Sequence, residues 1–90
     1  MKPKIKLQVF SGAHCGPCHA FKPVIKQFIE AHPEVELVEV MVTGNINEAK
    51  KYGVKSVPTS IVYKDDVEFT RFVGMRSKSS LELLLDEAMV

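Results

Sequence analysis

The sequence has no tryptophan and only two cysteines among its 90 residues. Two cysteines cannot supply the several disulfides that hold small secreted scaffolds together, nor a zinc site made of four cysteines. No apolar run approaches the roughly 20 residues that a transmembrane helix needs, so we expect no contact with a membrane. The sequence thus excludes disulfide-rich scaffolds, four-cysteine zinc modules and membrane-spanning proteins.

Charge is close to balanced, with 12 Lys and Arg against 11 Asp and Glu. Because nucleic-acid-binding domains usually carry a basic excess, we expect no nucleic-acid partner. Hydrophobic residues make up 46% of the sequence, an ordinary share for a folded domain. We predict one monomeric domain over residues 1–90. The start, MKPKIKLQVF, has no continuous apolar stretch and so does not fit a signal peptide, which favours the cytoplasm.

The first half of the chain shows two kinds of periodicity. Residues 4–10 alternate apolar and polar side chains, which predicts a strand, and residues 11–16 predict a loop of small residues. From Pro17 the pattern is helical, and Pro23 is expected to bend the helix axis before the helix ends near residue 32. The predicted apolar stripe of this helix consists of Phe21, Val24, Ile25, Phe28 and Ile29.

A second strand is predicted over residues 35–42. This segment is dense in valine, so we expect a central strand buried on both faces. Asn45 and Glu48 have the spacing of a capping box and predict a short helix that ends near Tyr52.

The last third of the chain predicts a hairpin and a helix. Strands over 59–63 and 67–73 flank a polar turn, and Ser77 or Ser79 caps the final helix. The element order is therefore β-α-β-α-β-β-α. We predict an α/β fold with a four-stranded mixed sheet, a right-handed crossover in its first unit, and three helices flanking the sheet.

The two cysteines form one motif, in which Gly16 and Pro17 separate Cys15 from Cys18. At a helix start this spacing brings the two sulfurs within disulfide reach. Amide groups and the helix dipole there stabilise a thiolate and lower the thiol pKa below its free value of about 8.5. We therefore predict that Cys15, at the exposed loop edge, is the nucleophile, and that the more buried Cys18 resolves the mixed disulfide.

Two other interpretations of the motif exist. A metal-binding module would use Cys15 and Cys18 with His14 or His19. A purely structural disulfide would close so small a loop that it would remove little entropy from the unfolded chain. The strand before the motif and the helix after it favour redox chemistry, and we expect no metal and no other cofactor.

Residues 15–18, Cys-Gly-Pro-Cys after a strand, resemble the active-site motif of the thioredoxin family. The segment from Tyr52 to Thr59 resembles the family's run that ends at a cis-proline, here Pro58, and Val73-Gly74 resembles the end of its last strand. The resemblance covers about residues 4–89. The sequence shows no counterpart of the N-terminal strand and helix of full-length thioredoxins, so the resemblance indicates a short, glutaredoxin-sized thioredoxin fold.

The resemblance also implies a function and a substrate surface. It implies a thiol–disulfide oxidoreductase that reduces protein disulfides and is itself reduced by an NADPH-dependent flavoprotein reductase. A cis Pro58 would face the cysteine pair, the Val57 backbone would pair with an extended substrate segment, and Gly74 would let the substrate approach closely.

Three positions depart from the family pattern. His14 stands where the family usually has tryptophan, and Val9 stands where it has a buried aspartate. Glu39 lies roughly where the family has a lysine in the second strand. Glu39 is therefore a candidate for proton transfer, with His14 or water as the alternatives.

A glutathione-coupled glutaredoxin is the alternative enzyme. Glutaredoxins carry a Gly-Gly pair and an aspartate after the last strand, whereas residues 73–77 here read Val-Gly-Met-Arg-Ser. Arg76 could still contact a glutathione carboxylate. A docking protein that uses the fold without catalysis is a third possibility.

Overall fold

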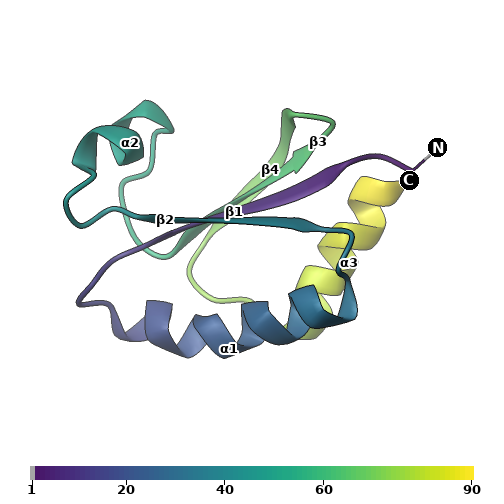
Figure 1. The fold of residues 1–90 in the computed structure, drawn as a ribbon, viewed down its shortest axis with the longest axis horizontal. Helices are drawn as coiled ribbons and strands as arrows, with labels where there is room; N and C mark the ends of the chain where they lie inside the picture. The colour runs from purple at the N-terminus through teal and green to yellow at the C-terminus, as the bar shows by residue number, and fades with distance from the viewer. Residues whose placement is uncertain (1) are drawn as a thin grey trace.

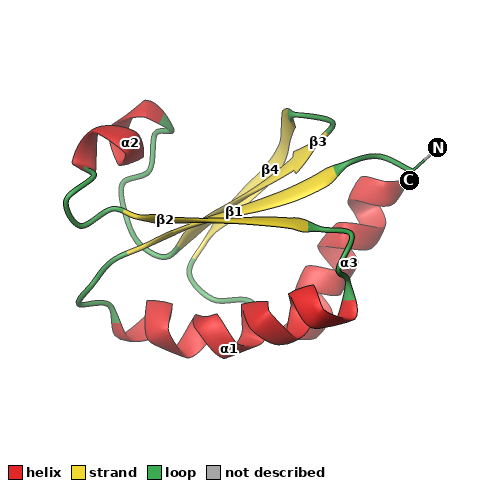
Figure 2. Cartoon of the chain, viewed as in Figure 1, coloured by secondary structure: helices red, strands yellow, loops and turns green. Residues whose placement is uncertain are grey.

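The structure is a computed structural model that describes residues 2–90. The elements follow the predicted order (Figures 1 and 2). They are β1 (Ile5–Ser11), α1 (Gly16–Ala31), β2 (Glu36–Met41), α2 (Ile46–Lys51), β3 (Thr59–Lys64), β4 (Val67–Val73) and α3 (Lys78–Met89). No helix within these residues is both long enough and apolar enough to cross a membrane.

The sheet has the strand order β2-β1-β3-β4. β1 pairs in parallel with β2 and antiparallel with β3, and β3 pairs antiparallel with β4. The sheet is therefore mixed, as predicted. β1 lies inside the sheet, and its end at Ser11 leads directly into the cysteine loop.

Helices lie on both faces of the sheet, with α1 and α3 on one face and α2 on the other (Figure 1). The larger core, between the sheet, α1 and α3, is built mainly from Ile5, Leu7, Val9, Phe21, Ile25, Phe28, Val62, Phe72, Leu81, Leu85 and Ala88. The smaller core beneath α2 holds Phe10, Ala49, Val54 and Ile61. The apolar stripe predicted for α1 faces the larger core, and so do the buried apolar residues of α3, since burying them stabilises both helices.

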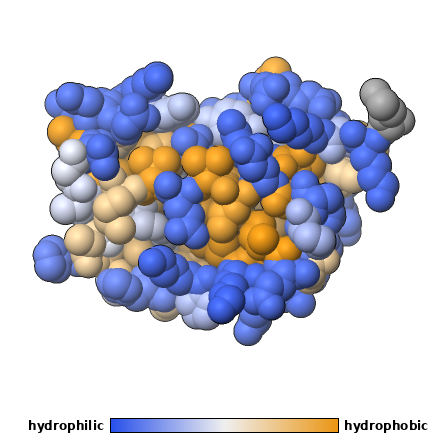
Figure 3. All heavy atoms as spheres, in the orientation of Figure 1, coloured by the Kyte–Doolittle hydropathy of each residue, from blue (hydrophilic) through white to orange (hydrophobic). Residues whose placement is uncertain are grey.

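β2 corrects one prediction, because it is an edge strand and not a central one. Within residues 2–90 it pairs with β1 alone, and Glu36 and Glu39 are exposed while Val38 and Val40 are half-buried. Valine is common in strands because it packs well on a pleated surface, so valine density alone does not place a strand within its sheet. Figure 3 shows a hydrophobic band across the middle of the view, where Figure 1 places β2.

The N-terminal ends of α2 and α3 correct one capping prediction and decide another. Asn45 is the N-cap residue of α2, but its side chain makes no capping bond there, and its Nδ2 donates instead to the Met41 carbonyl oxygen at 2.9 Å. The predicted capping box is therefore wrong. In α3 the Ser77 hydroxyl accepts from the Ser80 N–H at 3.1 Å, so Ser77 is the cap and Ser79 is not.

α1 is continuous across Pro23, and the expected bend of its axis stays a prediction. The helix ends at His32, whose ring Nε2 lies 2.8 Å from the Glu82 carboxylate on α3. This contact joins the C-terminal end of α1 to the helix beside it, so the end of α1 that is remote from the cysteines is anchored.

Candidate active site

Cys15 occupies the N-cap position of α1. Its backbone is extended, with φ −127° and ψ 105°, and its Sγ accepts from the Cys18 N–H at 3.2 Å. Pro17 follows in the first turn, where its missing N–H leaves no helical bond unmade. Because backbone N–H groups at a helix start favour negative charge, this position stabilises a thiolate on Cys15.

Cys15 and Cys18 are joined as a disulfide, with their Cα atoms 5.2 Å apart. The two cysteines differ in exposure, since Cys15 is half-buried and only 5% of Cys18 is exposed. The difference arises because Cys18 lies on the face of α1 that packs against the sheet. An incoming disulfide would therefore reach Cys15 before Cys18.

A second segment, residues 53–58, lies against the cysteines. The Val57 carbonyl oxygen is 3.8 Å from Cys15 Sγ, and the Val57–Pro58 peptide bond is cis, as the resemblance implied. The Pro58 carbonyl accepts from the Gly74 N–H at 2.8 Å. The structure thus brings Cys15, Val57, Pro58 and Gly74 together from three parts of the chain.

Gly74 has a left-handed backbone, with φ +88°. Within residues 2–90, apart from Gly74 itself and its two chain neighbours, no heavy atom lies within 4 Å of the position that a Cβ would take, so this side of the site is open. Its neighbours Val73 and Met75 are 66% and 45% exposed, and they add apolar surface beside the open space at Gly74. The geometry leaves room for another chain to approach the Gly74 backbone.

The other predicted site residues lie farther out. His14 is exposed on the loop, and Gly16 is exposed at the first position of α1. Glu39 is exposed on β2, in register with Val9 of β1. Within residues 2–90, no hydrogen bond joins Glu39 to the cysteine pair, so the structure does not bring it into the immediate site.

Two residues of the loop region were missed by the sequence analysis. The Thr43 hydroxyl accepts from the Ala13 N–H at 3.0 Å and so ties the cysteine loop to the segment after β2. A Cβ on Gly12 would lie 3.3 Å from Cγ2 of Val57, so glycine allows the two segments to pack closely. Gly12 could have been identified from the sequence, because small residues mark this loop, whereas no sequence pattern pointed to Thr43.

Ser60 was also missed. The residue is fully buried on β3, between Val9 of β1 and Phe72 of β4, and its hydroxyl has no partner among the described residues. A hydroxyl buried in this way is uncommon, because leaving it unpaired costs about 1–3 kcal/mol. Ser60 is the second residue of β3, two positions after Pro58.

A hollow next to the site is lined by Val42, Ile46, Ala49, Val54 and Val57, together with Lys55 and Ser56. It lies between α2 and the segment that carries Val57, and most of its lining is apolar. Within residues 2–90, no three His, Cys, Asp or Glu side chains are grouped so as to hold a metal ion.

This arrangement defines a class of protein. A cysteine pair that opens a helix after a parallel strand, with a cis-proline segment facing it, is the geometry of a dithiol–disulfide exchange protein. Comparison with known proteins agrees, because the family model described as Thioredoxin matches residues 2–87.

Relatives carry the same name. A thioredoxin of Chlamydia trachomatis is 35% identical over 78 residues, which are 87% of this chain and 76% of that protein. A thioredoxin of Staphylococcus epidermidis is 33% identical over 84 residues, 92% of this chain and 81% of that one. The solved structure of Fasciola hepatica thioredoxin has a TM-score of 0.85 at 30% identity and covers 94% of this chain and 81% of its own.

The chain belongs to the thioredoxin family. It is a thiol–disulfide oxidoreductase of the kind that reduces protein disulfides, and its redox centre is the Cys-x-x-Cys pair at disulfide distance.

Proposed function

We propose that Cys15 is the nucleophile and Cys18 the resolving residue in the reduction of protein disulfides. The Cys15 thiolate attacks one sulfur of the substrate disulfide, and the other substrate sulfur leaves as a thiolate and takes up a proton. Cys18 then loses its proton and attacks Cys15 Sγ, which releases the second substrate thiolate. Two electrons pass to the substrate, and the protein is left with the Cys15–Cys18 disulfide.

One observation carries this assignment, namely the different surroundings of the two sulfurs. Cys15 Sγ caps the helix and accepts the Cys18 N–H, whereas Cys18 is buried against the sheet. A thiolate is therefore favoured at Cys15 and disfavoured at Cys18. The Cys18 proton must still leave, and we propose Glu39, beside Val9 on the neighbouring strand, as its acceptor through water.

Substrate docking is proposed along Val57 and Gly74. The segment that carries Val57 lies against Cys15, and Gly74 is open on the other side. An extended substrate chain could pair with the Val57 backbone, and its disulfide would then reach Cys15. The exposed apolar side chains of Val73 and Met75 would add contact area without selecting one sequence.

Gly74 offers a test of this docking. Gly74→Asn keeps a residue that tolerates positive φ but adds a side chain where the substrate backbone would approach. We expect the KM for insulin, as the disulfide substrate, to rise about tenfold while kcat changes little, since one blocked docking contact is worth about 1.4 kcal/mol. Gly44→Asn is the matched control, because Gly44 also has positive φ and open space at its Cβ position. Equal KM values for Gly74→Asn and wild type would contradict docking at Gly74.

The electron donor is proposed to be an NADPH-dependent flavoprotein reductase, and a reducing compartment such as the cytoplasm would suit that role. Residues 73–77 support it, because they lack the second glycine and the acidic residue of a glutathione site. Insulin reduction should be rapid with NADPH and a thioredoxin reductase, and slower by at least about tenfold with glutathione and glutathione reductase. Activity with glutathione alone would instead establish the glutaredoxin alternative.

A further inference from the structure

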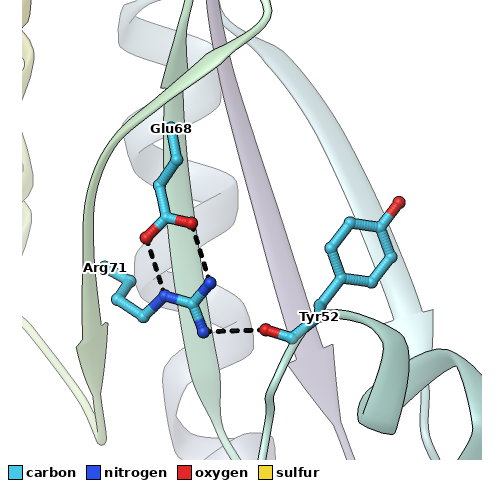
Figure 4. A network of polar contacts seen from close by, with 3 residues as sticks. All are labelled: Tyr52, Glu68 and Arg71. Carbon is cyan, nitrogen blue, oxygen red and sulfur yellow. Dashed lines mark hydrogen bonds and ion pairs between the residues drawn. The ribbon is translucent and has the colours of Figure 1, made fainter.

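A guanidinium on β4 reaches across to the end of α2. Arg71 Nη1 donates to the Tyr52 carbonyl oxygen at 2.9 Å, and its Nε and Nη2 donate to the two carboxylate oxygens of Glu68, each at 2.7 Å (Figure 4). Figure 4 shows the guanidinium between the carboxylate and the backbone carbonyl. All three donor nitrogens are therefore used, and the group is held in one orientation.

An irregularity in β4 makes this arrangement possible. In a regular strand, residues three positions apart point to opposite faces, so Glu68 could not reach Arg71. The pairing between β3 and β4 shifts at Val62 and Tyr63, which oppose Thr70 and Glu68, so Phe69 is an extra residue on β4. Such a bulge re-aims the side chains next to it, and here it places the carboxylate on the face of its guanidinium partner.

The carbonyl that Arg71 binds needs a donor. Tyr52 is the C-cap of α2, and carbonyls at a helix end have no partner within the helix. Gly53 then turns the chain with φ +70°, and the Val54 N–H returns to the Ala49 carbonyl at 2.8 Å. A cation at a helix C-terminus is also favoured by the helix dipole. The hydrogen bonds from Arg71, together with its charge, lower the pKa of the Glu68 carboxyl, so the carboxylate stays charged at lower pH than a free glutamate does.

β4 and the residue that follows it, Gly74, thus hold both ends of the segment that faces Cys15, residues 53–58. Arg71 binds Tyr52 at the start of the segment, and the Gly74 N–H binds the Pro58 carbonyl at its end at 2.8 Å. Between these two anchors lies Val57, whose carbonyl oxygen is 3.8 Å from Cys15 Sγ. The segment is therefore attached at one end to Arg71 in β4 and at the other to Gly74, directly after β4.

We infer that Arg71, oriented by Glu68, is a positioning residue that holds segment 53–58 against Cys15 for the docking of protein disulfides. This inference rests on the proposed function, because it assumes that substrates pair with Val57. Arg71 itself lies outside the reacting atoms and acts through the backbone of the segment.

The experiment compares two substrates. Arg71→Met keeps the aliphatic part of the side chain and removes the guanidinium, and Glu68→Gln leaves the guanidinium but removes its ionic partner. We expect KM for insulin to rise about three- to tenfold in both variants, as the loss of about one hydrogen bond implies, with kcat within about twofold. Amide hydrogen exchange should become faster at residues 54–57 than in the wild type. Arg71→Lys, with one donor group in place of the fork, should be intermediate.

A small aromatic disulfide such as dithiobis(nitrobenzoate) separates this inference from the proposed function, because it reaches Cys15 without docking along Val57. Lys4→Met serves as control, since it removes the exposed Lys4–Asp66 pair at the other end of the hairpin.

A rise in insulin KM with little change for the small disulfide supports positioning. Unchanged KM and unchanged exchange at residues 54–57 would overturn it. Equal losses with both substrates would also overturn it, whereas a wild-type protein inactive on both would refute the proposed function. If Arg71→Met fails to fold, Glu68→Gln decides.

Discussion

Cys15→Ser should abolish the reduction of insulin, lowering turnover by more than about a thousandfold. The serine hydroxyl is a far weaker nucleophile than the thiolate that the start of α1 stabilises at this position. Cys18 cannot replace it, because only 5% of Cys18 is exposed and it lies among the buried residues of α1. The measurement is insulin precipitation with dithiothreitol or a reductase as the electron donor.

The melting temperature of the Cys15→Ser variant serves as a control for its folding. Because neither protein contains the disulfide, the variant should melt close to the reduced wild-type protein, within a few degrees. His19→Ser, a change to serine at an exposed position in the same turn, should keep most of the activity. A Cys15→Ser protein that folds and still turns over insulin would show that the nucleophile has been wrongly assigned.

Cys18→Ser should give the opposite behaviour, a protein that reacts once and then stops. Cys15 keeps its helix cap and attacks a substrate disulfide, but no second thiol can release the product. We expect a covalent adduct at about one equivalent per protein, and steady turnover below about one thousandth of the wild-type rate. Mass spectrometry under non-reducing conditions measures the adduct, and dithiothreitol should release it.

The double variant with serine at both positions is the matched control, and it should form no adduct. Peptide mapping of the Cys18→Ser adduct should place the substrate on Cys15. Steady turnover by Cys18→Ser without added thiol would mean that release does not need Cys18, and the two-cysteine mechanism would fail.

Much of the fold could be predicted from the sequence because its helices and strands have different periodicities. The stripe of α1 from Phe21 to Ile29 and the alternation in β1 identify both elements, and the polar turn before Val67 identifies the hairpin. The place of β2 could not be predicted, because strand order depends on how the crossovers pack. Its valines fit a half-covered edge as well as a buried centre.

The candidate site, like the fold, could be predicted only in part from the sequence. Cys15 and Cys18 are local, so their spacing and the helix after them were enough to predict the redox pair. Contacts between distant segments had no local signal. The Thr43 bond to the cysteine loop, the buried Ser60 hydroxyl and the Arg71 bond to Tyr52 each depend on tertiary packing. The bulge that turns Glu68 toward Arg71 also arises only when β3 and β4 pair.

The edge position of β2 has a consequence for how the protein behaves in crowded solution. An open strand edge presents unpaired backbone groups and can recruit the same strand of another molecule. Glu36 and Glu39 are three positions apart and so lie on opposite faces of β2, which means that a ladder formed by two β2 strands would carry carboxylates from both molecules on each face. Like charges in such a ladder repel each other. The charges of the two glutamates therefore make edge-to-edge pairing of two copies through β2 less favourable on either face of the strand.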